Sequence, residues 1–323
     1  MKYDIRQAAQ ALISQLKAID YERLPISKYN KRYIARLKPV LSYYMKIYAD
    51  CLLKGLESIG SSPEEITLID YGGGSGFLSI LAKQAGIGRV IYIDLNPDSV
   101  DTIRILKELV NTGPDIILHG DSDTLADWCS ANKVKPQLLI ATDLIEHVYD
   151  LSAAIDNKMQ MLFTTASTPF NPYVKRRLHR LMTIWEKEYY ALRLHYIQLH
   201  FPALSPAEAK EAARKTRGLT FPHIHKAVKT GSYPLLKDAF NTCDPRNGNW
   251  TERILPIETY RSLAKPFGYQ VRIGKGFYNT DRSNPISTFI CLGINGLIRI
   301  SGKAGFLFAP FITLHLQSDN KGR

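Results

Sequence analysis

The sequence predicts an α/β protein in which a mostly parallel sheet carries helices on both faces. Short apolar runs alternate with helix-like segments between residues 66 and 165, a pattern typical of strands joined by crossover helices. A glycine-rich turn follows the first apolar run and is typical of a ligand-binding loop at the end of a strand. After the fifth run the alternation stops, which predicts a helical insertion into the sheet domain.

Each expected strand ends where a turn or a helix signal begins. The first five strands are expected over residues 66–71, 90–94, 115–119, 137–141 and 161–165. The helices between them are expected over residues 76–84, 98–110 and 124–131. After the insertion we expect a helix over 257–267, a strand over 270–274 and a last strand over 306–316.

The segment before the first strand has apolar residues at helical spacing throughout residues 5–58. A break at residues 24–27 separates two helical stretches, and Ser27 is a suitable N-cap for the second. The chain therefore divides into four expected parts. They are an N-terminal helical cap (1–60), a core (61–170), a basic helical insertion that serves as a substrate lid (171–250) and the C-terminal part of the core sheet (251–323).

The chain has a formal net charge of +12, and the charge is concentrated in one half. Residues 1–165 hold 18 Lys and Arg against 20 Asp and Glu, a balance of −2, whereas residues 166–323 hold 24 against 10, a balance of +14. A basic half attracts a polyanion, an anionic membrane surface or an acidic substrate, and a solvated surface is the simpler alternative. With 45% hydrophobic residues, the composition excludes an intrinsically disordered chain.

The sequence contains few features that indicate a cellular compartment. The four cysteines lie far apart and form no CxxC pair, which argues against a zinc ribbon or a secreted disulfide framework. The first residues contain no apolar signal region. We therefore expect a cytoplasmic protein, with peripheral contact to an anionic membrane as an alternative.

The strongest functional signal is the turn after the first strand. Asp70 closes that strand, and the turn reads Tyr71-Gly72-Gly73-Gly74-Ser75-Gly76. The glycines at 72, 74 and 76 do not have the G-x-G-x-x-G spacing of a dinucleotide fingerprint. Glycines let a ligand lie against the backbone, and a nearby carboxylate favours a positively charged ligand.

This turn resembles motif I of the class I S-adenosylmethionine-dependent methyltransferases, which share a Rossmann-like fold. Three more positions follow in the family's order. Asp94, followed by Leu95, closes the second strand, where the family's acid binds both ribose hydroxyls. Asp121, followed by Ser122, resembles the family's adenine contact. The segment from Asp143 to Val148 is similar to the family's D-x-x-E-H-V segment, particularly in the ubiquinone-pathway O-methyltransferase branch.

The resemblance implies a seven-stranded, mostly parallel sheet and a methyltransferase of enzyme class EC 2.1.1. It implies S-adenosyl-L-methionine as the methyl donor and S-adenosyl-L-homocysteine as the product. The cofactor-binding residues that it implies are Asp70, Tyr71, Gly72, Gly73, Gly74, Gly76, Asp94, Leu95, Asp121, Ser122 and Asp143.

Methyl transfer to an oxygen requires removal of a proton from the acceptor, and the catalytic candidates are His147 and Glu146. His147 is the candidate general base. In the ubiquinone-pathway branch, and in 2′-O-methyltransferases of small RNA, an acid-x-x-Glu-His cluster holds a divalent cation. Asp143, Glu146 and His147 would then hold Mg²⁺, although glutamate is usual at the first position. In the simplest alternative, Glu146 and His147 only begin and pack a helix.

Two further segments bear on the acceptor. The first helix of the insertion combines basic residues with a packing face for the core, and its alternative is an amphipathic lid or a membrane-surface element. The expected packing residues are Leu178, Leu181, Trp185, Tyr189 and Leu192. Residues 286–300 are markedly apolar but too short to cross a bilayer, so we expect a buried helix over the sheet, with an interfacial helix as the alternative.

Aromatic residues in the N-terminal helices and the insertion are candidates for an acceptor lining. They are Tyr29, Tyr33, Tyr43, Tyr44, Tyr173, Trp185, Tyr189 and Tyr190. Such a lining suits a small-molecule or lipid-like acceptor, methylated at oxygen. The alternatives are an RNA methyltransferase, suggested by the basic half although no RNA-binding module is visible, and a non-catalytic methyltransferase-like subunit. The sequence does not predict the oligomeric state.

Overall fold

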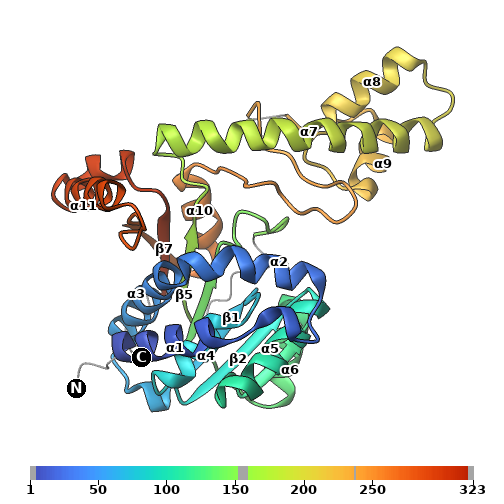
Figure 1. Cartoon of the computed structure of the whole chain (residues 1–323). Coiled ribbons are helices and arrows are strands. Elements are labelled where there is room, and N and C mark those ends of the chain that lie inside the picture. The colour runs from blue at the N-terminus through green and yellow to red at the C-terminus, as the bar shows by residue number, and fades with distance from the viewer. Residues whose placement is uncertain (1–4, 152–158, 236–237, 319–323) are drawn as a thin grey trace.

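The computed structural model describes residues 5–151, 159–235 and 238–318, and its centre is a seven-stranded sheet (Figure 1). The strand order is β3-β2-β1-β4-β5-β7-β6. The strands are β1 (Thr67–Tyr71), β2 (Arg89–Asp94), β3 (Ile116–His119), β4 (Leu138–Thr142), β5 (Gln160–Thr165), β6 (Tyr269–Lys275) and β7 (Ile312–Ser318). Strands β1 to β5 pair in parallel, and β7 lies antiparallel between β5 and β6. The expected seven-stranded, mostly parallel sheet is confirmed.

The direction of strand order reverses between β1 and β4, which are neighbours in the sheet. In an open parallel sheet, ligands bind at such a switch point, beyond the carboxyl ends of the strands. The glycine-rich turn follows the carboxyl end of β1, and Asp143 follows that of β4. The topology therefore brings the predicted motifs to one edge of the sheet.

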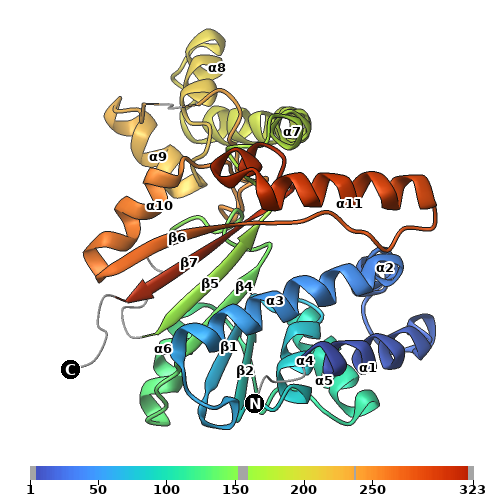
Figure 2. The ribbon, with the colours of Figure 1, turned by 90° about the vertical axis from the view of Figure 1, so that its left-hand side faces the viewer.

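Two helical layers cover the sheet (Figure 2). On one face lie α1 (Ile5–Ala18), α2 (Lys28–Leu37), α3 (Leu41–Ile59), α4 (Phe77–Gln84) and α5 (Pro97–Val110). On the other face lie α6 (Ser122–Ala131) and α10 (Ile257–Ala264). Ser27 caps α2 as predicted, because its side chain accepts a hydrogen bond from the Asn30 amide at 3.2 Å.

The predicted last strand, 306–316, begins too early. Residues Gly302–Leu307 form a 3-10 helix (η5), and β7 starts only at Ile312. Pro310 has no amide hydrogen for a strand ladder and restricts the residue before it, so pairing begins after it. The other expected strands differ from the observed ones by at most one residue at either end.

The helix expected over residues 286–300 forms as α11 (Pro285–Ile300), but the expectation that it is buried is wrong. Only Cys291 and Ile298 of this helix are buried. The segment is apolar on nearly every side, so its periodicity did not show how few of its residues the protein covers. In the part of the chain that the structure describes, no helix is both long enough and apolar enough to span a bilayer.

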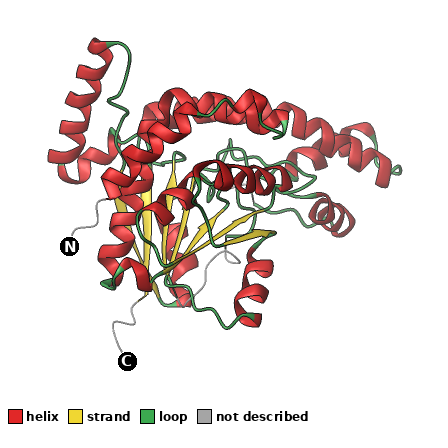
Figure 3. Ribbon diagram, turned by 60° about the horizontal axis from the view of Figure 1, so that its bottom comes forward, coloured by secondary structure: helices red, strands yellow, loops and turns green. Residues whose placement is uncertain are grey.

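The insertion forms α7 (Pro172–His200), α8 (Pro206–Lys215) and α9 (Phe221–Thr230), and it extends away from the sheet (Figures 1 and 3). Its far end has a small core of its own, made of Ile197, Ala209, Ala212, Ala213 and Ile224. Leu178 and Tyr189 are buried as expected, whereas Leu181 and Trp185 are exposed. A helix of 29 residues extends beyond the core, so its apolar face is covered only in part.

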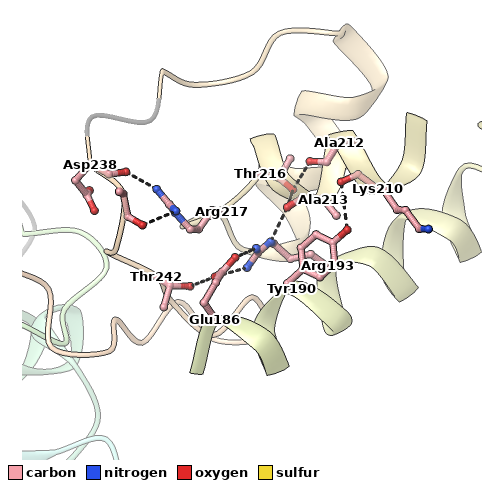
Figure 4. Close-up of polar contacts among 11 residues, drawn as sticks. Glu186, Tyr190, Arg193, Lys210, Ala212, Ala213, Thr216, Arg217, Asp238 and Thr242 are labelled. Atoms are coloured by element: carbon pink, nitrogen blue, oxygen red, sulfur yellow. Dashed lines mark hydrogen bonds and ion pairs between the residues drawn. The ribbon is translucent and has the colours of Figure 1, made fainter. Parts of the chain in front are cut away.

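A buried arginine joins the elements of the insertion (Figure 4). The Arg193 side chain is fully buried, and its Nη2 lies 2.5 Å from Glu186 Oε1. Its Nε donates to the Ala213 carbonyl at 3.0 Å, and Thr242 Oγ1 donates to Glu186 Oε2 at 2.6 Å. One ion pair therefore links α7 to α8 and to the chain that returns from α9.

Replacing Arg193 should loosen this insertion. In Arg193→Met we expect the free energy of local opening of residues 186–216 to fall by about 3 kcal/mol, since the Ala213 carbonyl and Glu186 lose their partner. Native-state hydrogen exchange measures this opening. Arg214→Met is the control, because Arg214 pairs with Glu211 at the surface and its loss should cost less than about 1 kcal/mol. Equal protection in the two variants would contradict the assignment.

Candidate functional site

The turn after β1 can be made only with glycine at two of its positions. Gly72 and Gly76 have φ of +68° and +74°. A Cβ on Gly72 would lie 2.6 Å from Leu144 Cδ2, and one on Gly76 would lie 2.1 Å from Ile103 Cδ1. Side chains at these positions would be strained and would clash. The turn therefore lies tightly between the loop after β4 and helix α5.

Asp94, the last residue of β2, holds this turn in place through hydrogen bonds. Asp94 Oδ2 accepts from the Gly74 amide at 2.9 Å, and Asp94 Oδ1 accepts from the Asn96 amide at 2.8 Å. The Tyr92 hydroxyl donates to the Gly74 carbonyl at 2.6 Å. A carboxylate oxygen can accept more than one hydrogen bond, so Asp94 retains the capacity to bind ligand hydroxyls.

A cavity of about 260 Å³ opens beside the turn. Six of the residues predicted to bind a cofactor line it: Tyr71, Gly72, Asp94, Leu95, Asp121 and Ser122. The lining also contains His147 and Asp150, and none of the lining residues that the structure describes is Lys or Arg. The carboxylates of Asp94 and Asp121 give this cavity a negative character, which favours a positively charged ligand.

Five predicted cofactor residues, Asp70, Gly73, Gly74, Gly76 and Asp143, are not part of that lining. Asp70 is only 2% exposed. Its Oδ2 accepts from the Ser79 amide at 3.0 Å and from the Ser79 hydroxyl at 2.7 Å, and burial raises the pKa of this carboxyl to about 7. Asp70 therefore joins the end of β1 to α4 on the buried side of the turn.

Asp143, directly after β4, lies in a second group of acids. It is accessible to solvent but deeply surrounded by protein, and its φ of +51° is unusual for a residue other than glycine. This surrounding and the charge of Glu252 raise the pKa of Asp143 to about 6, while His147 acts in the opposite direction. A carboxyl with a pKa near neutrality is typical of functional sites.

Glu146 lies behind the surface of the site. It is 1% exposed, and its Oε2 has no hydrogen-bond partner among the described residues. Burial, and then the charge of Asp143, raise the pKa of the Glu146 carboxyl well above its usual range. It therefore lies behind the residues that line the cavity.

His147 faces the cavity in one defined tautomer. Its Nδ1 lies 2.8 Å from the Trp250 carbonyl oxygen. Since a carbonyl can only accept, Nδ1 carries the hydrogen and Nε2 of the neutral ring keeps a free lone pair. This geometry fits a general base.

The candidate metal ligands Asp143, Glu146 and His147 are not grouped around a common point among the described residues. Within residues 5–151, 159–235 and 238–318, no three His, Cys, Asp or Glu side chains come together as ligands for a metal ion. Asp143, Glu146 and His147 therefore do not make a ligand set, because Glu146 is turned into the core and His147 Nδ1 is held by a carbonyl.

The sequence did not reveal that the end of the insertion returns to the site. The Trp250 amide donates to the His147 carbonyl at 3.2 Å, and the Arg253 amide donates to the Glu146 carbonyl at 3.1 Å. Glu252 then accepts from the Ser167 hydroxyl at 3.0 Å. The run Asn247-Gly248-Asn249 signals a turn in the sequence, but nothing there identifies its partner.

The aromatic candidates divide into two separate groups. Tyr29, Tyr33, Tyr43 and Tyr44 lie on α2 and α3. Burial and then neighbouring charges, including that of Asp143, raise the pKa values of the last three. Tyr48 on α3 is also buried, and the sequence analysis did not name it. Burial raises its pKa, and the charge of Asp143 contributes to the rise. Tyr173, Trp185, Tyr189 and Tyr190 lie on α7 instead, so the eight candidates do not form one lining.

Comparisons with known proteins are consistent with this architecture. No protein-family model matches the chain. Ribosomal protein L11 methyltransferase from Burkholderia mallei (strain NCTC 10229) is 55% identical over 38 residues, which are 12% of this chain and 13% of that protein. The protein of the same name from Shewanella sp. (strain W3-18-1) is 30% identical over 108 residues, 33% of this chain and 34% of that protein.

Alignments with solved methyltransferase structures extend over most of the chain, but at low TM-scores. Magnesium protoporphyrin IX methyltransferase from Synechocystis PCC 6803 with bound SAH has a TM-score of 0.40 and 15% identity, over 87% of this chain and 86% of that chain. A SAM-dependent methyltransferase from Archaeoglobus fulgidus has a TM-score of 0.35 and 15% identity, over 85% of this chain and 99% of that chain.

The sequence matches and the strand order confirm the predicted resemblance. In fold and in donor-site motif, the chain is of the class I S-adenosylmethionine-dependent methyltransferase type. The chain spans only 13% of the length of the first curated relatives that it matches, and those matches therefore do not identify its acceptor.

The ionised carboxylate of Asp143 should lower the free energy of unfolding at pH values above about 6. The fold raises its pKa from 3.8 to about 6, so ionisation of Asp143 is less favourable in the folded than in the unfolded chain. We expect Asp143→Asn to raise the melting temperature at about pH 7.5, since Asn also tolerates positive φ. The gain should disappear below about pH 4, where the carboxyl is protonated in both states.

Thermal denaturation at the two pH values measures this effect. Asp101→Asn is the matched control, because Asp101 lies at the surface beside Arg104 and its replacement should change the melting temperature little at either pH. A lower melting temperature for Asp143→Asn at the higher pH would contradict the predicted pKa.

Proposed function

We propose that the protein transfers a methyl group from S-adenosyl-L-methionine to an oxygen atom of a small-molecule or lipid-like acceptor. The observation that carries this proposal is the negative cavity beside the glycine turn, at the switch point of the sheet. A sulfonium nucleoside carries a positive charge and no phosphate, so its charge complements this cavity, whereas the phosphates of a dinucleotide do not.

Each part of the donor has a residue suited to it in this cavity. Asp94 retains lone pairs for two ribose hydroxyls. Asp121 Oδ1 accepts from the Asp123 amide at 3.1 Å and the Thr124 amide at 3.2 Å, which caps α6 and leaves Oδ2 for the exocyclic amine of adenine. These contacts, led by that of Thr124, lower the pKa of Asp121, so it accepts hydrogen bonds as a carboxylate at neutral pH.

We propose that the acceptor binds near Asp143, on the side of the tyrosines of α2 and α3. Burial raises the pKa of Tyr33, and the charges of Asp143 and Asp94 contribute to this rise, so Tyr33 is within electrostatic range of both acids. Phenol rings and carboxylates offer an apolar surface with a few polar groups, which suits an uncharged or cationic acceptor with a hydroxyl.

The donor supplies an electrophilic methyl group on a positively charged sulfur. The chain's own task is to exclude water, align the acceptor oxygen and remove its proton. We assign proton removal to Asp143, because its raised pKa makes it a stronger base than an ordinary aspartate. His147 Nε2 is the second candidate, and Glu146 acts only by positioning the loop.

Two other functions remain as alternatives. The relatives that match in sequence are named for a ribosomal protein, so a protein acceptor is an alternative to a small molecule. The exposed basic residues at the start of α7 keep an RNA acceptor as another alternative. The acidic and aromatic surroundings of Asp143 favour the small acceptor over a polyanion.

Calorimetry with S-adenosylhomocysteine tests the proposal. We expect the wild-type protein to bind it and Asp94→Asn to bind it about tenfold or more weakly, because charge-assisted hydrogen bonds to the ribose are weakened. Asp127→Asn, an exposed change on α6, is the control and should bind as the wild type does. If the wild-type protein gives no heat and no thermal shift, the donor site is not what we propose.

A further inference from the structure

Helix α11 presents its more apolar side to solvent. The inner side of this helix carries Cys291 and Ile298, which are buried, and also Asn295, whose amide group exchanges two hydrogen bonds with the Tyr278 backbone at 2.7 and 2.9 Å. Its exposed large side chains are Ile286, Phe289, Ile290, Leu292, Leu297 and Ile300. A surface helix normally has the opposite arrangement.

The exposure is high and continues past the helix. Phe289 and Ile300 are each 78% exposed. Leu307 and Phe308, at the end of η5, add two more exposed apolar side chains. We call this surface of α11 and η5 the apolar arm. Contiguous apolar surface of this kind marks a site of interaction with a partner or a membrane.

The apolar arm carries only positive charge. From Pro285 to Phe311 the sequence contains no Asp or Glu, and its charged residues are Arg299 and Lys303. Both are exposed. An apolar helix face with cations and without acids is typical of elements that lie in the interface of an anionic membrane.

A basic surface lies next to the arm. The start of α7 and the end of η5 are neighbours, since the rings of Phe170 and Phe306 are 5.1 Å apart and Asn171 Nδ2 donates to the Ala309 carbonyl at 3.0 Å. Figures 1 and 2 both show α11 beside the first turns of α7. The two surfaces therefore lie at the same end of the molecule.

On α7 this surface forms a hollow of about 410 Å³, which we call the basic hollow. Lys175, Arg176 and Arg180 line it, together with His179 and Phe240, whose rings stack at 3.8 Å. None of these three cations forms an ion pair with an acidic side chain in the described chain, and α7 has no acid before Glu186. A hollow with three unpaired cations is suited to a phosphate group.

We propose that the apolar arm and the basic hollow together dock the protein onto an anionic membrane surface. The exposed side chains of the arm enter the apolar part of the interface, and the cations of the hollow contact lipid phosphates. No helix of the described chain spans a bilayer, so the contact is peripheral. This inference does not depend on the proposed methyl transfer.

Charge complementarity favours a membrane over a second copy of the chain. In a twofold dimer through the apolar arm, the same patch of each copy would meet, which would bring Arg299, Lys303 and the basic hollows of two copies close together. Like charges at an interface are costly, and the arm has no acid to offset them. An anionic lipid surface neutralises the same cations.

Vesicle sedimentation with the whole 323-residue chain tests the proposal without any cofactor. The probes are vesicles of phosphatidylcholine alone and of phosphatidylcholine mixed with phosphatidylglycerol. We expect binding to the mixed vesicles, weaker binding at high salt and weak binding to phosphatidylcholine alone. Phe289→Glu with Ile300→Glu should weaken binding to the mixed vesicles by about tenfold or more, because two exposed apolar anchors become charged.

The matched control is Leu109→Glu with Leu199→Glu, which adds the same two charges at exposed leucines on α5 and at the far end of α7. It should bind vesicles nearly as the wild type does. Arg176→Gln with Arg180→Gln leaves the arm intact and should reduce the preference for anionic vesicles. Absence of wild-type binding to the mixed vesicles, or equal losses in the arm variant and its control, would overturn the proposal. A dimer in sedimentation velocity that the arm substitutions dissociate would overturn it too.

Discussion

The hydrogen bond between the Asp94 carboxylate and the Gly74 amide joins the two strands on which the site depends. It joins the end of β2 to the turn after β1. Tyr92, also on β2, adds a second bond, because its hydroxyl donates to the Gly74 carbonyl. The turn also requires positive φ at Gly72, Gly74 and Gly76, a conformation that glycine adopts at the least cost. Asp94 is thereby held at the switch point, where with Asp121 it gives the cavity its negative character.

Two acidic groups with different tasks meet at this edge of the sheet. Asp94 and Asp121 are accessible hydrogen-bond acceptors in the donor cavity. Asp143 and Glu146, on the loop after β4, have raised pKa values because protein surrounds them and because they repel one another or Glu252. Raised carboxyl pKa values of this kind are common at functional sites.

Residues 247–253 make the site a composite of distant parts of the chain. They return from the insertion and bind the backbone of the loop after β4, which places Glu252 near Asp143. The helices of the insertion, by contrast, form their own core away from the sheet. The role of residues 171–250 as a substrate lid stays a prediction, and its best support is that Asn247 and Asn249 line the donor cavity.

The sequence predicts the sheet and the donor motif well because both depend on local patterns. Apolar runs define the strands, and glycine spacing defines the turn. It could not predict the contact of Glu252 with the site, because that contact joins residues about a hundred positions apart through backbone hydrogen bonds. It also could not show that α11 is exposed, since a helix that is apolar on nearly every side has the same pattern whether or not other elements cover it.

A crystal structure of the complex with S-adenosylhomocysteine tests the central claim most directly. We expect both ribose hydroxyls within hydrogen-bond distance of Asp94, the adenine beside Asp121 and the sulfur facing the side of Asp143. A ligand bound elsewhere on the molecule, or a ribose out of reach of Asp94, would contradict the account.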